Sequence, residues 1–248
     1  MIDAIITPQK FDAVLFDMDG VLTATAKVHA ASWKKMFDGF LKKRAAETGQ
    51  PCKPFDIKTD YKLYVDGKLR DEGVSSFLES RSIKLPFGEA GGPPEQETVS
   101  GLGNRKNELV NKIIETEGVD IYEGSIALVR LLRQEGIKTA VVSASKNCET
   151  VLNVTGITDL FDVMVDGNVA ARLGLPGKPA PDTFLQAAKM LDTEPQRAVV
   201  VEDAISGVQA GRAGNFGLVI GVDRHGEPDS LKNNGADIVV DDLDKFLP

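Results

Sequence analysis

The chain has 248 residues, a formal net charge of −8 and a pI near 4.9. Its length fits one large domain or a core with a smaller second domain, and its acidity argues against nonspecific nucleic-acid binding. No apolar stretch reaches the roughly 20 residues that span a bilayer. Cys52 and Cys148 stand far apart without metal-type spacing, which is typical of a reducing compartment. We therefore expect a cytoplasmic monomer without nucleic-acid or membrane partners.

The first predicted element is a short buried strand over 13–16, which ends at Asp17 and is followed by Asp19 and Gly20. Apolar runs bounded by turn residues are typical of strands in a parallel sheet. The carboxyl ends of such strands are where open α/β sheets place their sites. Two carboxylates this close would raise one pKa unless a positive charge lies beside them, and a metal ion is the simplest such charge.

The rest of the chain predicts a lid followed by an alternating α/β region. Apolar spacing predicts a helix over 26–40, and the Pro- and Gly-rich segment 49–103 resembles an inserted lid with one short helix at 75–80. A further helix is expected over 104–116. Beyond it, helices and strands alternate, which favours a doubly wound parallel sheet. The expected later elements are strands at 138–142, 163–165, 198–201, 218–221 and 238–240, and helices at 125–134, 147–154, from Pro181, and at 204–213.

Polar residues gather where these strands end. They are Asp17 with Asp19, Ser143, Lys178 in a loop before a helix, and Glu202 with Asp203. In a parallel sheet these ends share one edge, so residues remote in sequence can converge. Each feature alone has an ordinary explanation, since such residues often form turns, cap helices or lie in solvent. Together they supply the carboxylates, hydroxyl and cation that phosphoryl transfer requires.

Phosphoryl transfer assigns a role to each group. Asp17 is the expected nucleophile, which forms an aspartyl-phosphate, and Asp19 is the expected acid and base. Lys178 would neutralise charge between Asp17 and the phosphoryl group, while Ser143 and nearby N–H groups would bind the phosphoryl oxygens.

The expected cofactor is Mg²⁺, because hard oxygen ligands hold this ion in phosphoryl-transfer sites. Asp203, with help from Glu202, would complete its shell beside Asp17 and Asp19.

These segments resemble the four motifs of the haloacid dehalogenase superfamily. The matching residues are Asp17-Met18-Asp19-Gly20-Val21, Ser143, Gly177-Lys178-Pro179 and Glu202-Asp203. The resemblance covers nearly the whole chain. It implies a Rossmann-like α/β core at 1–24 and 107–248, with a helical cap inserted at 25–106. It also implies that the metal binds the Asp17 carboxylate, the Asp19 main-chain carbonyl and the Asp203 carboxylate.

Within that superfamily, further details resemble the β-phosphoglucomutase-like subgroup. They are Thr25-Ala26, His29, Trp33, Arg105-Lys106-Asn107, Ser143-Ala144-Ser145-Lys146-Asn147 and Lys178-Pro179-Ala180-Pro181-Asp182. The resemblance implies a phosphorylated sugar substrate whose non-reacting phosphate is held by Ser145, Lys146, Asn147 and Arg70. The full set of expected substrate-binding residues is His29, Trp33, Arg70, Lys106, Ala144, Ser145, Lys146 and Asn147.

Two of these assignments have open alternatives. His29 and Trp33 lie four apart on one helical face, so they either pack a hinge helix or place His29 near Asp19. Lys106 is either a solvated lysine or a group that reaches the sugar.

Three functions compete for the same core. A mutase converting β-glucose 1-phosphate to glucose 6-phosphate must keep water from the aspartyl-phosphate, whereas a sugar-phosphate phosphatase must admit it. The resemblance implies that Lys146-Asn147 and a cap arginine would form a distal-phosphate site, which favours the mutase. A non-enzymatic phospho-accepting receiver would lack an insert as large as 25–106 and the second aspartate, Asp19.

Overall fold

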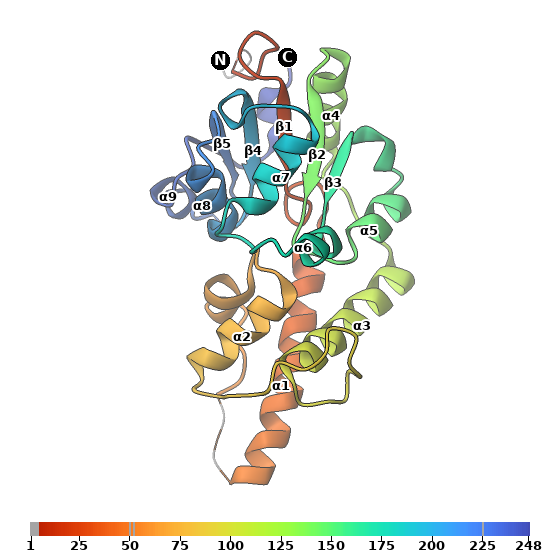
Figure 1. Cartoon of the computed structure of the whole chain (residues 1–248), viewed down its shortest axis with the longest axis vertical. Coiled ribbons are helices and arrows are strands. Elements are labelled where there is room, and N and C mark those ends of the chain that lie inside the picture. The colour runs from red at the N-terminus through yellow and green to blue at the C-terminus, as the bar shows by residue number, and fades with distance from the viewer. Residues whose placement is uncertain (1–4, 50, 52, 225) are drawn as a thin grey trace. The chain divides into compact units, whose positions relative to one another are not determined.

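The computed structural model describes residues 5–49, 51, 53–224 and 226–248. The chain divides into two compact units, a first unit of 1–24 and 119–248 and a second unit of 25–118 (Figure 1). The expected boundary at 106 falls inside helix α3 (Val99–Glu117), which runs on unbroken until Gly118 donates its N–H to the Ile114 carbonyl. The second unit is helical, and the first is α/β.

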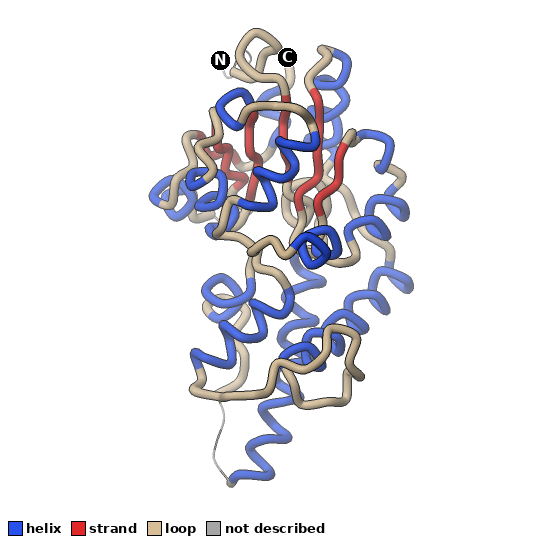
Figure 2. The backbone as a smooth tube through the Cα atoms, viewed as in Figure 1, coloured by secondary structure: helices blue, strands red, loops and turns tan. Residues whose placement is uncertain are grey.

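Six parallel strands form one sheet in the described part of the first unit, in the order β3-β2-β1-β4-β5-β6 (Figure 2). Their bounds are β1 (Ala13–Phe16), β2 (Lys138–Val142), β3 (Val163–Val165), β4 (Ala198–Glu202), β5 (Leu218–Val222) and β6 (Ile238–Val240). β1 lies between β2 and β4, with Phe16 in register with Val141 and Val201. The residues that follow these three strands therefore share one edge. The predicted Rossmann-like sheet is confirmed.

Successive side chains along a strand point to opposite faces of the sheet. Since the strand residues are buried on both faces, helices and loops must cover both. Leu15 and Val200 pack on one face with Phe184 of helix α7, which lies in front of the strands in Figure 1. On the other face the Phe16 ring meets Phe161 edge-on at 6.4 Å. The helices of this unit are α4 (Glu123–Gln134), α5 (Cys148–Thr155), α6 (Gly167–Leu173), α7 (Asp182–Met190), α8 (Ile205–Ala213) and α9 (Pro228–Asn233). Single 3₁₀ turns cover η2 (Thr158–Leu160), η3 (Pro195–Arg197) and η4 (Leu243–Phe246).

The short helices α6 and α9 have no counterpart in the sequence prediction. With seven and six residues, these helices are too short to show a helical period, so only capping could have revealed them. The Asp166 carboxylate caps α6 by accepting the N–H groups of Asn168 and Val169. The longer α5 ends where predicted, at Gly156, whose φ of 67° is left-handed and disfavours other residues.

The second unit contains α1 (Ala26–Thr48), the π-helical turn η1 (Tyr61–Val65), α2 (Arg70–Ser80) and α3. Its core is aromatic, with the Phe37 ring 4.0 Å from Phe77 and 5.3 Å from Trp33. Helix α3 begins at Val99, before the expected 104, because the Thr98 hydroxyl accepts the Gly101 N–H and caps it. Among the described helices, none combines the length and apolarity needed to cross a membrane.

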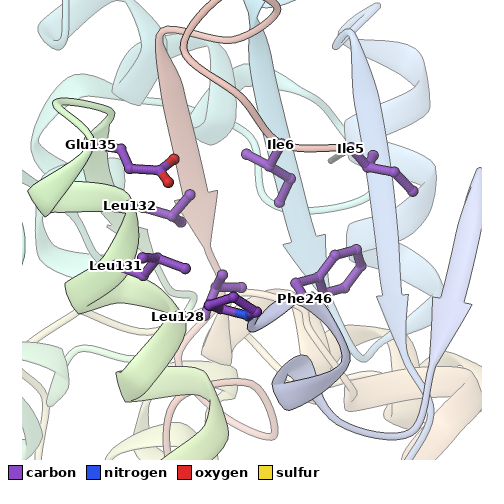
Figure 3. Close-up of a pocket in the computed structure, with 8 residues that line it drawn as sticks. Ile5, Ile6, Leu128, Leu131, Leu132, Glu135 and Phe246 are labelled. Carbon is purple, nitrogen blue, oxygen red and sulfur yellow. The ribbon is translucent and has the colours of Figure 1, made fainter. Parts of the chain in front are cut away.

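An apolar cavity of about 90 Å³ lies in the first unit, away from the predicted site (Figure 3). It is lined by Ile5, Ile6, Leu128, Leu131, Leu132, Glu135, Phe246 and Pro248. Helix α4, the N-terminal segment and the last turn of the chain contribute these side chains. None of the described lining residues belongs to the predicted site.

Candidate active site

The centre of the site is Lys178, a lysine that bridges two carboxylates. Its Nζ donates to Asp17 Oδ1 at 2.5 Å and to Glu202 Oε1 at 2.5 Å, and also to the Val142 carbonyl at 3.1 Å. The exposed fraction is 6% for Asp17, 3% for Lys178 and 0% for Glu202. Buried charges are tolerated only when they are paired and hydrogen-bonded, and this cluster meets both conditions. Three strand ends are thus linked through one ammonium group.

Burial and neighbouring charges both shift the pKa values of Asp17 and Lys178. Burial raises the pKa of Asp17, and the negative charges of Glu202 and Asp19 raise it further, against the opposing effect of Lys178. For Lys178, burial alone would lower the pKa, but the carboxylates of Asp17 and Glu202 outweigh it and raise the pKa. The lysine therefore stays protonated and supplies a permanent positive charge beside Asp17.

The loop after β1 places Asp19 and needs a glycine beside it. The Met18 carbonyl accepts the N–H groups of Leu22 and Thr23, and the Gly20 N–H donates to the Thr23 carbonyl, so the chain turns tightly. Gly20 has a φ of +84°, and a Cβ there would lie 1.8 Å from Asp203 Oδ2. A side chain at position 20 would therefore strain the backbone and displace Asp203.

Carboxylate oxygens of Asp17, Glu202 and Asp203 lie within 4.8 Å of one another, and this all-oxygen set is the donor chemistry that Mg²⁺ prefers. Glu202 already accepts from Lys178 through Oε1 and from the Ala204 N–H through Oε2 at 2.9 Å. We therefore expect Glu202 mainly to hold the lysine. The carboxylates of Asp17, Glu202 and Asp203 therefore fit a divalent cation.

The predicted phosphate-binding loop follows β2. Ser143 is 2% exposed, and its hydroxyl accepts the Ser145 N–H at 3.0 Å. The Ser145 hydroxyl in turn accepts the Asn147 N–H at 3.1 Å. The carbonyl of Lys146 accepts from the Asn168 amide at 2.8 Å, which ties this loop to α6. The loop that contains Ala144 is thus held in shape by hydrogen bonds to its own serine hydroxyl groups and by one hydrogen bond from α6.

In the second unit, three of the predicted residues come together. Lys106 Nζ lies 2.9 Å from His29 Nδ1 and 5.0 Å from the centroid of the Trp33 ring. Lys106 is 6% exposed, so it is not a solvated surface lysine. Trp33 packs in the aromatic core of the second unit, and His29 contacts the Lys106 ammonium. A position of His29 near Asp19 stays a prediction.

Arg70 lies beside α3, where its Nε is close to Gly103, one helical turn before Lys106. It is the first residue of α2, and its Nε lies 3.4 Å from Asp71 Oδ1. A Cβ at Gly103 would lie 2.8 Å from Asp71 Oδ1 and 3.1 Å from Arg70 Nε. Glycine at this position therefore leaves room for the side chains of the first turn of α2 against α3.

Comparison with known proteins matches residues 11–215 to a family model of the haloacid dehalogenase-like hydrolases. The chain belongs to this family. It is 47% identical to a β-phosphoglucomutase of Mycobacterium bovis over 97% of the chain and 93% of that protein. A β-phosphoglucomutase of Bacillus subtilis is 32% identical over 92% of the chain and 88% of that protein.

Structural comparison agrees with this family. A crystal structure of β-phosphoglucomutase from Clostridium difficile matches with a TM-score of 0.74 and 31% identity, covering 95% of the chain and 93% of that structure. The family and the fold support a phosphotransferase or phosphatase, so the chain is an enzyme of this family and the receiver alternative is wrong.

Sequence analysis did not find the groups that hold the β1 loop from outside. The Ser125 hydroxyl donates to the Val21 carbonyl at 2.6 Å, and the Tyr122 N–H donates to the Leu22 carbonyl at 2.9 Å. Arg224 Nε donates to the Gly20 carbonyl at 2.8 Å. No local sequence pattern predicts these contacts, because they join segments that only the fold brings together.

Proposed function

We propose that this enzyme is a β-phosphoglucomutase, which converts β-glucose 1-phosphate into glucose 6-phosphate through a phosphorylated Asp17. The observation that carries the proposal is the buried Asp17–Lys178–Glu202 cluster at the end of β1. It is supported by 47% identity to a β-phosphoglucomutase over 97% of the chain.

The reaction begins with phosphoryl transfer to Asp17. A carboxylate oxygen of Asp17 forms a bond to the phosphorus of a hexose bisphosphate, and the bond from phosphorus to the sugar oxygen breaks. Asp19 gives its proton to that departing oxygen, which leaves as a hydroxyl group. Lys178, fixed beside Asp17 at 2.5 Å, offsets the charge that gathers around the phosphoryl group.

The second transfer reverses these roles. A hydroxyl group of the hexose monophosphate attacks the aspartyl-phosphate, Asp19 takes the hydroxyl proton, and the bond between Asp17 and phosphorus breaks. A sugar that donates the phosphate from one carbon and accepts it at another is thereby isomerised. Ser143 and the N–H groups of its loop would bind the phosphoryl oxygens in both steps.

A divalent cation fits beside these groups. The Asp17 and Asp203 carboxylates and the Asp19 main-chain carbonyl would hold Mg²⁺, with Glu202 fixing Lys178 next to it. When bound, the ion supplies electrostatic shielding between the phosphate and the attacking carboxylate.

Binding of the second phosphate distinguishes a mutase from a phosphatase. We assign the non-reacting phosphate to Ser145, Lys146, Asn147 and Arg70, because a bisphosphate must be held by both of its charged ends. His29, Trp33 and Lys106 form a buried cation and aromatic cluster suited to the sugar. A phosphatase would need no such second site.

The deciding experiment follows the fate of the phosphate. The enzyme is incubated with β-glucose 1-phosphate, Mg²⁺ and a trace of β-glucose 1,6-bisphosphate, and glucose 6-phosphate and free phosphate are both measured. We expect glucose 6-phosphate in excess, dependence on the bisphosphate, and no product from Asp17→Asn. Release of phosphate as the main product would instead make the enzyme a sugar-phosphate phosphatase, and full activity of Asp17→Asn would remove the nucleophile assignment.

A further inference from the structure

We propose that Arg224 is a positioning residue for Asp19, and that it acts by fixing the Gly20–Val21 peptide, which lies one residue beyond Asp19 in the β1 loop. This inference rests on the proposed function, in which Asp19 protonates the departing sugar oxygen. Arg224 follows β5, is remote in sequence from the loop and belongs to none of the family motifs described above. Its contacts to Gly20, Tyr122, Asp241 and Asp242 lie within the first unit.

The first observation is the contact to the loop itself. Arg224 Nε donates to the Gly20 carbonyl at 2.8 Å, and that carbonyl belongs to the residue directly after Asp19. Gly20 has a left-handed φ of +84°, which few residues adopt and which only Gly adopts without strain. A glycine turn is intrinsically mobile, so a hydrogen bond from a charged donor is an effective way to hold one conformation.

The second observation is that the guanidinium is held on three sides. Its Nη1 donates to the Asp241 carbonyl at 2.9 Å and to Asp242 Oδ2 at 3.1 Å. Its Cζ lies 3.6 Å from the centroid of the Tyr122 ring, which is a close cation–π stack. Asp241, Asp242 and the Tyr122 ring fix the position of the guanidinium. Its Nε can therefore hold the Gly20 carbonyl in one position.

The third observation is that Tyr122 contacts the same loop. Its N–H donates to the Leu22 carbonyl at 2.9 Å, and the neighbouring Ser125 hydroxyl donates to the Val21 carbonyl at 2.6 Å. Three successive loop carbonyls, from Gly20 to Leu22, are thus bound from outside the loop. Arg224 binds the Gly20 carbonyl, which is next to Asp19, and it stacks on Tyr122, whose own N–H binds the Leu22 carbonyl.

This arrangement makes a specific kinetic prediction. A misplaced Asp19 should slow phosphoryl transfer from donors whose leaving oxygen needs a proton, and should spare donors that leave as a stable anion. A sugar phosphate belongs to the first class, and p-nitrophenyl phosphate belongs to the second. A purely structural loss would slow both donors alike.

The experiment measures the first turnover by rapid quench, with β-glucose 1,6-bisphosphate and with p-nitrophenyl phosphate, at a Mg²⁺ concentration that saturates each variant, so that a weaker hold on the ion does not slow both donors. For Arg224→Ala we expect the sugar donor to slow by about 10- to 100-fold and the nitrophenyl donor by less than about 3-fold. Arg224→Lys should recover part of the loss, because an ammonium group can donate to the Gly20 carbonyl but cannot make all the fork contacts. If Arg224→Ala fails to fold, the same comparison is made with Arg224→Lys and Asp242→Asn.

The matched control is Arg212→Ala. Arg212 also binds a glycine carbonyl, that of Gly235, at 2.8 Å through Nη2, and pairs with Asp237, but it lies outside the β1 loop. It should change the rates of both donors equally or not at all. Equal slowing of both donors in Arg224→Ala would overturn the positioning role.

The variant Asp19→Ala separates this inference from the proposed function. If Asp19→Ala discriminates between the two donors and Arg224→Ala does not, only the Arg224 inference fails. If Asp19→Ala slows both donors equally, or if the wild-type enzyme transfers phosphate from neither, the proposed function itself fails.

Discussion

The two units of this protein place their buried charges in different ways. In the first unit, Lys178 and its carboxylate partners come from the ends of β1 and β4 and the loop before α7, and the parallel sheet brings them together. In the second unit, Lys106 meets His29 because two helices, α1 and α3, pack around an aromatic core. The first arrangement is dictated by backbone topology, and the second by how particular side chains fill space.

This difference decides how each cluster should respond to substitution. Removing one member of the charge network at the strand ends should abolish most of the turnover, while the sheet still folds. A cluster supported by aromatic packing should depend on the helices around it. The following four tests of this contrast run from the largest expected effect to the smallest.

Lys178→Met removes the shared cation of the first unit. Loss of the charge beside Asp17 should lower turnover by about 10³-fold or more. It also leaves Asp17 and Glu202 buried without their partner, which should cost about 3–5 kcal/mol of stability. Steady-state kinetics and urea unfolding monitored by circular dichroism measure both effects.

Lys178→Arg serves as the control, since it keeps the positive charge but replaces the compact ammonium group with a larger planar guanidinium. It should retain more stability than Lys178→Met while recovering little activity. Unchanged activity in Lys178→Met would show that the buried cation has no part in the chemistry.

Phe77→Ala tests the packing of the second unit. The Phe77 ring lies 4.0 Å from Phe37 and 5.1 Å from Phe55, and none of these rings reaches solvent to more than 1%. The cavity should cost about 3–5 kcal/mol of the stability of this unit. The single tryptophan, Trp33, lies in the same unit, so its fluorescence reports that loss directly.

The core counterpart Phe184→Ala should leave the Trp33 transition nearly unchanged while it lowers the circular-dichroism transition. If both variants moved the two signals together, the units would unfold as one and the contrast would not hold.

Sequence analysis found the strand-end cluster because its signal is local. Each of Asp17, Ser143, Lys178 and Asp203 follows an apolar run or precedes a helix, and a parallel sheet leaves little freedom in where such residues go. The approximate strands of the sheet followed from the same patterns. The contacts among His29, Trp33 and Lys106 could be suspected only by resemblance, because the α1–α3 packing that buries Lys106 depends on distant aromatic residues.

The limits of helix prediction had the same origin. Helix α2 begins at Arg70, before the predicted start at 75, and its first turn is polar, with Asp71 and Glu72. Apolar periodicity therefore could not reveal it. Arg224 was missed for a related reason, since its role depends on a carbonyl of Gly20 that carries no sequence information.

Lys106→Ala tests whether the cation of the second unit serves the substrate. We expect mutase flux to fall by about 10- to 100-fold, because a positioned group is lost without removing any group that bonds to phosphorus. Hydrolysis of p-nitrophenyl phosphate should change by less than about 3-fold under the same argument.

Lys112→Ala is the matched control for this variant, because Lys112 is an exposed lysine on the same helix α3. It should leave both activities unchanged. If Lys106→Ala slowed the two reactions equally, the cluster would be structural only.

The smallest effect concerns two carboxylates whose pKa is lowered, one in each unit. Burial acts to raise the pKa of Asp162, but hydrogen bonds from the Thr139 N–H and from Arg133 outweigh it and lower the pKa. These partners are remote in sequence. Hydrogen bonds from Thr59 lower the pKa of Asp56, and they close within three residues.

A carboxylate with a lowered pKa stabilises the folded state above its unfolded pKa, near 3.9, and that stabilisation is lost as the pH falls through the folded pKa. Asp162→Asn should therefore reduce Tm at pH 6 and converge with wild type as the pH approaches 3, as followed by thermal unfolding. Asp56→Asn should change this acid dependence less, because local hydrogen bonds can persist in the unfolded chain and cancel from the difference. Asp159→Asn removes an exposed carboxylate from the same turn region as Asp162 and controls for net charge. An equal loss of acid dependence in Asp56→Asn and Asp162→Asn would mean that long-range assembly adds nothing to these carboxylates beyond their local turns.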